Sequence, residues 1–211
     1  MEFKLKKFAL ILDIETLSTR SNAVITELAL TMVNLSTGEL DFCIDQNFNT
    51  VEQIDQGFHF DQGTEQWAID NLPETVYLDR VTKCNAIQNN KDTLEKLIER
   101  VDLALKKYLN DGFNVYCKGG NFDYPILTNF CNHYLNTPNA FPWSFRQELC
   151  IRLFESMFYD KQELKVMHNE VKDHVSEILG REAIPHTAID DTLMEAEFFH
   201  RVYTRLVDAL N

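Results

Sequence analysis

The stretch from Phe8 to Thr16 constrains the fold more than any other part of the chain. Its first five residues, Phe8 to Leu12, are apolar without interruption, which is typical of a strand buried on both faces of a sheet. Asp13 and Glu15 follow two positions apart, so both point to one side while Ile14 points into the core. Adjacent carboxylates repel each other unless a proton or a cation lies between them, and the hard cations Mg²⁺ and Mn²⁺ fit such a pair.

The acidic pair is weak evidence when it is taken alone. With 33 acidic residues among 211, an acid-x-acid pair is expected about five times by chance. Asp45, Asp61 and Glu65 have similar acidic neighbours in loops. Two solvated acids at a strand end therefore remain an alternative interpretation. The buried strand favours a metal site, because it fixes both the Asp13 and the Glu15 side chain.

The composition indicates one globular domain over residues 1–211. A chain that is 45% hydrophobic can bury one substantial core. The five cysteines have an odd count and no Cys-x-x-Cys spacing, which favours reduced thiols in a cytoplasm over disulfides or a zinc ribbon. Lys4, Lys6 and Lys7 before the first strand resemble the start of a signal peptide, but the apolar run is too short and ends in Asp13. No stretch is long enough for a membrane span.

The formal net charge of −13 argues against non-specific binding of nucleic acid by a broad basic surface. It does not exclude an enzyme that acts on nucleic acid. Metal ions can screen the site locally, and a few arginines or lysines can hold one or two phosphates.

Apolar periodicity and turn residues predict three strands, helix, strand, helix, strand, helix, which is an α/β fold with a mixed five-stranded sheet. Thr64 is the expected cap of the first, short helix. After the first strand, we expect strands at 24–33, 40–48 and 114–117, a short strand and helix within 149–158, and helices from 64 to near 73, at 92–109, 124–134, 165–179 and 186–210.

Two further acids and a histidine stand where the site could use them. Asp123 follows the fourth strand, and Gly119 and Gly120 before it allow close approach of a ligand. His186 lies at the entry of the last helix, and Asp191 follows five residues later. Four carboxylates and one imidazole at one sheet edge supply a two-metal site and a general base, which together suit the attack of water on a phosphodiester.

These residues resemble the DEDDh 3′–5′ exonucleases of the ribonuclease-H-like fold. The matching motifs are Asp13-Ile-Glu15, Asp123 in Gly-Asn-Phe-Asp-Tyr-Pro-Ile-Leu, and His186-x-x-x-x-Asp191. The branch with phage exonuclease A proteins and a mycobacterial exoribonuclease is the most similar. That similarity rests on Ala23-Val24-Ile25, Thr64-x-x-Trp67 and Cys117-Lys-Gly119.

The resemblance implies hydrolysis of single-stranded nucleic acid from its 3′ end to nucleoside 5′-monophosphates. It implies that Asp13 bridges two Mg²⁺ or Mn²⁺ ions, that Glu15 and Asp191 complete the shell of the first, and that Asp123 holds the second. His186 would take a proton from the attacking water. The implied substrate-binding residues are Thr16, Leu17 as a wedge against the terminal base, Trp67, Asn121, Phe122 and Arg152.

The resemblance also bears on partners and location. Its phage-like character slightly favours DNA over RNA and a protein encoded by a phage in the host cytoplasm, and relatives in this family often form homodimers. Two departures concern substrate preference. Cys150-Ile-Arg152-Leu stands where the branch has Asp-Val-Arg-Thr, and Ala68 replaces a second Trp.

Several alternatives stay open on the sequence alone. His168 and Asp173 repeat the spacing of His186 and Asp191, although in a charged helical run, and Asp190 adjoins Asp191. Trp67 could equally be a core residue, whereas Cys150 is expected in the core. The alternative function is a catalytically idle module on the same fold that binds a nucleic-acid end or a protein. A phosphohydrolase for free nucleotides has less support, because no Gly-rich phosphate loop is present.

Overall fold

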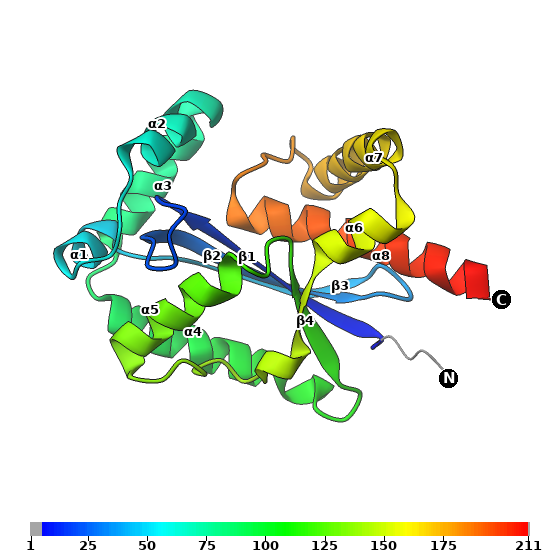
Figure 1. Ribbon diagram of the computed structural model, residues 1–211, viewed down its shortest axis with the longest axis horizontal. Helices are drawn as coiled ribbons and strands as arrows, with labels where there is room; N and C mark the ends of the chain where they lie inside the picture. The colour runs from blue at the N-terminus through cyan, green and yellow to red at the C-terminus, as the bar shows by residue number, and fades with distance from the viewer. Residues whose placement is uncertain (1–5, 211) are drawn as a thin grey trace.

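The computed structural model describes residues 6–210 and is organised around a single mixed sheet, as the sequence predicts (Figure 1). The strand order is β3-β2-β1-β4-β5. β1 pairs antiparallel with β2 and parallel with β4, β2 pairs antiparallel with β3, and β4 pairs parallel with β5. The strands are β1 (Phe8–Thr16), β2 (Ile25–Asn34), β3 (Leu40–Asn47), β4 (Phe113–Cys117) and β5 (Glu148–Cys150).

Helices cover both faces of this sheet. In Figure 1, α4 and α5 lie on one side and α7 and α8 on the other, while α1, α2 and α3 form a group at the end of the sheet. The helices are α1 (Thr50–Asp55), α2 (Gln62–Asn71), α3 (Glu74–Ala86), α4 (Asn90–Leu105, followed by a 3₁₀ turn at Lys106–Tyr108), α5 (Asp123–Leu135), α6 (Ile151–Phe158, after a 3₁₀ turn at Phe145–Gln147), α7 (Lys161–Leu179) and α8 (Ala188–Leu210).

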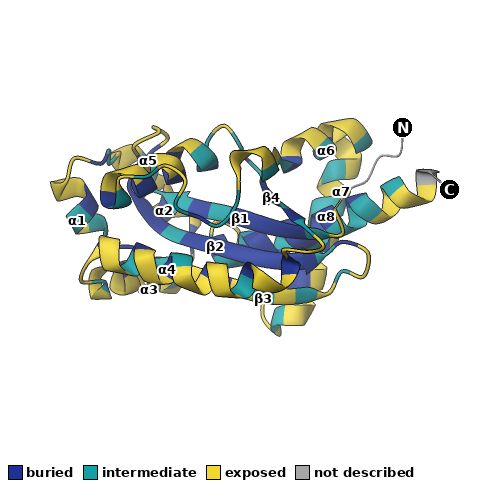
Figure 2. Ribbon diagram, turned by 90° about the horizontal axis from the view of Figure 1, so that it is seen from below, coloured by how far each residue is buried: buried dark blue, intermediate teal, exposed yellow. Residues whose placement is uncertain are grey.

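Strand β1 supplies side chains to two separate cores, because alternate residues face opposite sides of the sheet. Leu10, Leu12 and Ile14 pack in the core beneath α4 and α5. Ala9 and Ile11 pack on the other face with residues of α7 and α8. Figure 2 shows the strands as the buried middle layer, with the outer faces of the helices exposed. Asp13 and Glu15 continue the series of Ala9 and Ile11, so β1 delivers both acids to the α8 side.

The sequence prediction is wrong about the start of the helix that was expected from residue 64 to near residue 73. Helix α2 begins at Gln62, and Asp61 is its cap rather than Thr64. The Thr64 backbone N–H donates to Asp61 Oδ1 over 2.8 Å. A carboxylate on an extended residue satisfies the free amides of the first turn, and Asp61 is the residue that has this backbone conformation.

Two helices escape the sequence analysis, α1 and α3. Helix α3 follows Pro73 and has Leu78 and Val81 exposed, so its apolar residues do not mark its buried side. Its buried residues are Arg80 and Cys84. A helix that packs through a charged side chain gives no apolar stripe for periodicity to detect.

The five cysteines are free, in agreement with the prediction of reduced thiols. Cys150 is half-buried at the end of β5, so it is not the core residue that the sequence suggested. Within residues 6–210, no helix is both long and apolar enough to cross a bilayer. Lys4 of the basic start lies outside the described residues.

Candidate active site

A cavity of about 500 Å³ opens where β1 and β4 end. It brings together the five residues that the sequence singled out, Asp13, Glu15, Asp123, His186 and Asp191. Adjacent parallel strands end at the same sheet edge, and β1 and β4 are such a pair. Ile14, Thr16, Lys118, Gly119, Asn121, Phe122, Arg152 and Glu195 complete the lining.

Asp13 lies at the centre of this acidic group. Its Oδ2 atom is buried and has no hydrogen-bond partner among the described residues. Burial, followed by the Glu15, Glu195 and Asp191 carboxylates, raises the pKa of Asp13 well above its ordinary value. Burial also raises the pKa of Glu15 to about 8, although Arg80 acts in the opposite direction. Both shifts show that negative charge in this cavity is poorly compensated by the protein itself.

Asp123 and Asp191 reach the cavity from the first turns of two helices. Asp123 opens α5, and a Cβ on Gly119 would lie 3.1 Å from its Oδ2 atom, so the glycine leaves room for this carboxylate. Asp191 Oδ2 accepts a 3.0 Å hydrogen bond from the backbone N–H of His186. Burial raises the pKa of each of these aspartates to about 6.

His186 occupies a short loop before α8, with a left-handed φ of 65°. Its imidazole packs edge-on against the Trp67 indole, and the ring centroids are 4.7 Å apart. Burial and then the Arg80 guanidinium lower the pKa of His186. A lowered pKa keeps the imidazole neutral at neutral pH, so it can accept a proton.

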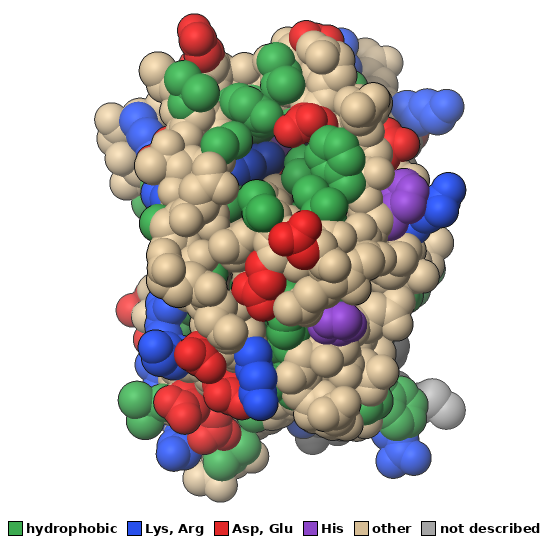
Figure 3. Space-filling model, turned by 90° about the vertical axis from the view of Figure 1, so that its left-hand side faces the viewer, with side chains coloured by type: hydrophobic (Ala, Val, Ile, Leu, Met, Phe, Trp, Pro, Cys, Tyr) green, Lys and Arg blue, Asp and Glu red, His purple; other side chains and the backbone are tan. Residues whose placement is uncertain are grey.

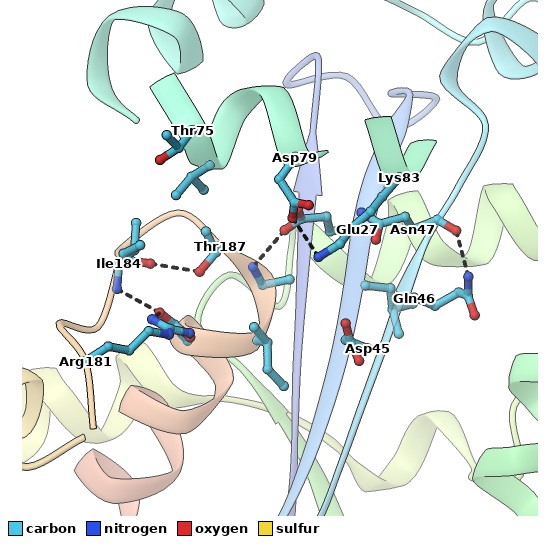
Figure 4. Close-up of a pocket in the computed structure, with 15 residues that line it drawn as sticks. Glu27, Asp45, Gln46, Asn47, Thr75, Asp79, Lys83, Arg181, Ile184 and Thr187 are labelled. Atoms are coloured by element: carbon cyan, nitrogen blue, oxygen red, sulfur yellow. Dashed lines mark hydrogen bonds and ion pairs between the residues drawn. The ribbon is translucent and has the colours of Figure 1, made fainter. Parts of the chain in front are cut away.

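Asp190 does not enter the cavity, although it adjoins Asp191. Asp190 is fully buried and accepts two hydrogen bonds from Arg181, at 2.7 and 2.8 Å, and one from the Ile184 backbone N–H at 2.8 Å. Figure 4 shows Arg181 and Ile184 on the chain segment that leads into α8. Asp190 therefore anchors the loop that presents His186, and Asp191 is the member of the pair that faces the acids.

Arg80 is a second anchor, and the sequence analysis missed it. Its Nε atom donates to Glu27 Oε1 over 2.8 Å, its Nη1 atom lies 3.9 Å from Glu15 Oε2, and its Nη2 atom donates to the His186 carbonyl oxygen. Glu27 also accepts from the backbone N–H of Ala188 over 3.2 Å. Arg80 thus connects β1, β2 and the His186 loop. Nothing in the sequence marked it, because α3 itself was not predicted.

Glu195 was also missed, although a signal existed. It follows Asp191 by four residues on α8, which places both side chains on one helix face. The basic side chains in the cavity wall are Lys118 and Arg152. The Nζ atom of Lys118 is 3.1 Å from Glu155 Oε1.

Four of the six predicted substrate-binding residues line the cavity: Thr16, Asn121, Phe122 and Arg152. Trp67 is 45% exposed beside His186, so it is not the core residue of the alternative interpretation. The structure does not bring Leu17 to the cavity. Leu17 is 9% exposed and packs in the core beneath α4 and α5, because its backbone pairs with Val24 and draws the side chain inward.

His168 lies outside the acidic cavity. It borders a neighbouring cavity of about 450 Å³, where its Nε2 atom is 3.3 Å from Glu155 Oε1. His168 and Asp173 therefore do not repeat the arrangement of His186 and Asp191. The other histidines make packing or surface contacts: His59 with Ser18, His133 with Gln56, His174 with Glu197, and His200 with Leu35.

The donor set fits a divalent cation. Ligand atoms of Glu15, His186 and Asp191 lie within 4.8 Å of one another, and Asp13 offers a buried oxygen without a partner. Hard divalent cations favour the carboxylate oxygens of this set over the imidazole nitrogen, and they remove the repulsion among the carboxylates. The end of the molecule in Figure 3 intersperses acidic, basic and hydrophobic side chains, and its described residues form no broad basic surface.

Comparisons with solved structures show the same fold. The structure of a full-length 3′-exonuclease matches with a TM-score of 0.62 and 18% identity, covering 98% of this chain and 84% of that one. The nuclease domain of 3′hExo, a DEDDh family member bound to rAMP, matches with a TM-score of 0.57 and 16% identity over 96% and 92% of the two chains. The zinc-bound complex of Escherichia coli ExoI with single-stranded DNA matches with a TM-score of 0.59 and 13% identity, over 98% of this chain and 43% of that one.

The sheet order, the flanking helices and these matches define a ribonuclease-H-like exonuclease fold. Residues 9–203 match the model of the family described as the 3′-5′ exoribonuclease Rv2179c-like domain, and the chain belongs to that family of 3′–5′ exonucleases. A comparison with curated proteins gives no match.

Proposed function

We propose that this protein is a single-domain, metal-dependent 3′–5′ exonuclease that releases nucleoside 5′-monophosphates from single-stranded nucleic acid. The observation that supports this most directly is the concentration of Asp13, Glu15, Asp123 and Asp191 in one cavity beside His186, whose pKa is lowered by burial. The buried acids lack sufficient positive charge from the protein. A catalytically idle module would have no reason to retain this unfavourable arrangement.

Two divalent ions, Mg²⁺ or Mn²⁺, are the proposed cofactors. Asp13 would contact both ions, Glu15 and Asp191 would hold the first, and Asp123 would hold the second. When bound, such ions activate a water and stabilise charge on the scissile phosphate. The 4.8 Å cluster of Glu15, His186 and Asp191 and the unpartnered oxygen of Asp13 support this assignment.

The protein's own groups have separate roles in this proposal. The His186 imidazole accepts the proton of the attacking water, and Trp67 and Arg80 keep the ring and its loop in position. Arg152 lies in the cavity wall and would neutralise a phosphate oxygen of the substrate. Thr16, Asn121 and Phe122 would contact the terminal nucleotide from the same wall.

Some observations favour DNA as the substrate and others favour RNA. The phage-like sequence character slightly favours DNA, whereas the description of the matched family names an exoribonuclease. The ExoI structure holds single-stranded DNA, and the 3′hExo structure holds rAMP. A homodimer and a phage origin stay predictions from the resemblance. A measurement of the molecular mass in solution tests the homodimer.

The deciding experiment is a time course with 5′-labelled single-stranded DNA and RNA of one sequence, each with Mg²⁺, Mn²⁺ or EDTA. Stepwise shortening from the 3′ end that stops in EDTA is the expected result, and the faster substrate identifies the preferred sugar. Intact label on both substrates, with folded protein and bound metal, would instead favour the binding module.

A further inference from the structure

A fifth acidic side chain, Glu195, reaches the candidate active site from α8. Glu195 lines the same cavity as Asp13, Asp123 and Asp191, and also borders the neighbouring cavity beside α7. It is 8% exposed. Its Oε2 atom is buried and has no hydrogen-bond partner within the described part of the chain.

Among the described residues, Glu195 forms no ion pair or hydrogen bond with a basic side chain. Lys118 lies in the same wall, but its Nζ atom is 3.1 Å from Glu155 Oε1 and 3.5 Å from His168 Nε2. Burial raises the pKa of Glu195 well above its ordinary value, and Asp191 and Asp123 raise it further against the opposing effect of Lys118. A carboxylate that is buried without a partner destabilises the fold, so a purely structural role would favour an apolar residue.

The charges of the cavity indicate what is missing. Asp13, Glu15, Asp123, Asp191 and Glu195 together have a formal charge of −5 when all are ionised. Arg80 lies 3.9 Å from Glu15 but is paired with Glu27 at 2.8 Å, so Arg152 in the cavity wall is the cation that offsets one of these charges. Lys118 and Glu155 neutralise each other across their 3.1 Å contact. The remaining −4 equals in magnitude the charge of two divalent cations.

We propose that Glu195 is an additional metal-binding side chain of this site and supplies one oxygen, directly or through a water, to a divalent ion held with Asp13. The inference rests on the proposed function and extends it, since the four acids of the sequence motifs do not include Glu195. Its position one helical turn after Asp191 lets α8 contribute two carboxylates to the same site.

The test compares Mn²⁺ binding to the wild-type protein, Glu195→Gln and Glu197→Gln by isothermal titration calorimetry. Glu197 is the matched control, because it is two residues further along the same helix and pairs with Arg201 outside the cavity. We expect Glu195→Gln to lose one Mn²⁺ or to bind it at least ten times more weakly. Glu197→Gln should retain the wild-type affinity and stoichiometry.

Thermal unfolding in EDTA provides a second readout that does not depend on activity. Glu195→Gln should melt above the wild type without metal, because a buried negative charge is gone, and it should gain less in melting temperature when Mn²⁺ is added. Glu195→Met, which removes the charge at similar volume, should behave in the same way and guards against a folding defect specific to one variant.

The outcomes separate the two levels of the proposal. Wild-type affinity and stoichiometry in both Glu195 variants would overturn the role of Glu195 and leave the exonuclease proposal standing, provided that the wild type binds Mn²⁺. A wild-type protein that binds no Mn²⁺ would overturn both. Equal weakening in Glu197→Gln and Glu195→Gln would also overturn the role of Glu195, because the effect would then belong to the helix and not to the site.

Discussion

The imidazole of His186 meets the indole of Trp67 edge to face, with ring centroids 4.7 Å apart and ring planes at 85°. The two residues come from distant parts of the chain, since Trp67 lies in α2 and His186 lies in the loop before α8. His186 also adopts a left-handed backbone conformation that a β-carbon disfavours. The Trp67 contact holds the imidazole ring in place. The Arg80 hydrogen bond to the His186 carbonyl oxygen holds the backbone in this conformation.

Trp67→Ala should lower kcat by roughly 10–100-fold, because loss of the indole frees the ring of the proposed base and small misplacements of such a group are costly. Trp67→Phe retains an aromatic edge and should remain within a few-fold of the wild type. Single-turnover rates on a short single strand measure the chemical step. Equal rates for the alanine variant and the wild type would show that the contact does not position His186.

His186→Ala should slow the chemical step by roughly 10²–10⁴-fold, as expected for loss of a positioned base. His168→Ala is the matched control, since His168 has the same spacing to an aspartate but lies against Glu155 in the neighbouring cavity. The control should retain nearly full activity. The reverse pattern in the two variants would transfer the role of base to His168.

Asp13→Asn should reduce hydrolysis by at least about a thousand-fold, because several kcal/mol of metal-dependent stabilisation disappear with the central ligand. The variant should fold normally and should unfold at a higher temperature than the wild type in EDTA, since its buried Oδ2 has no partner and its neighbours are acidic. Circular dichroism and a hydrolysis assay check both statements. Appreciable activity in Asp13→Asn would remove Asp13 from the metal set.

The metal-free protein should lose stability as the pH rises from about 4 to about 8. The native pKa of Glu15 is raised from 4.5 to about 8, and those of Asp123 and Asp191 from 3.8 to about 6. In this range the native state retains protons that the unfolded chain has released, so the free energy of unfolding falls with increasing pH. Melting temperatures in EDTA at several pH values measure the slope, and saturating Mn²⁺ should reduce it.

The dependence of melting temperature on pH should be compared with that of Glu15→Gln, which lacks the carboxyl whose pKa is about 8. Its melting temperature in EDTA should vary less between pH 6 and pH 8 than that of the wild type. A wild-type protein that becomes more stable across this interval would contradict the predicted sign.

Asp190→Ala should lower the free energy of unfolding by about 1–3 kcal/mol, because it removes charged hydrogen bonds and leaves the Ile184 N–H without its acceptor. It should also lower kcat, since the His186 loop loses its anchor. Asp173→Ala, at an exposed position of α7, should change stability by less than about 0.5 kcal/mol. Urea denaturation and initial rates test the pair, and equal stabilities for the two variants would contradict the anchoring role of Asp190.

Local sequence signals predicted the sheet well. The apolar run of β1 and the two-residue alternation that follows are short-range features, so they predicted a doubly buried strand and two acids on one face. The long helices α4 and α8 have apolar periodicity that needs no knowledge of the rest of the fold. Helix α3 packs through Arg80 and Cys84 instead, and that is why periodicity gave no sign of it.

The sequence by itself determined the mixed sheet, the order of the acidic motifs and the position of His186 before the last helix. The spacing from His186 favoured Asp191 over Asp190, and the structure places Asp191 in the cavity. Only the tertiary structure decided that Leu17 packs in the core and that Arg80 and Glu195 lie beside the acids. The reason is physical. Strand alternation is set by neighbouring residues, whereas the meeting of α3, β1 and the His186 loop depends on contacts across more than a hundred residues of chain, as in the Arg80 bond to His186.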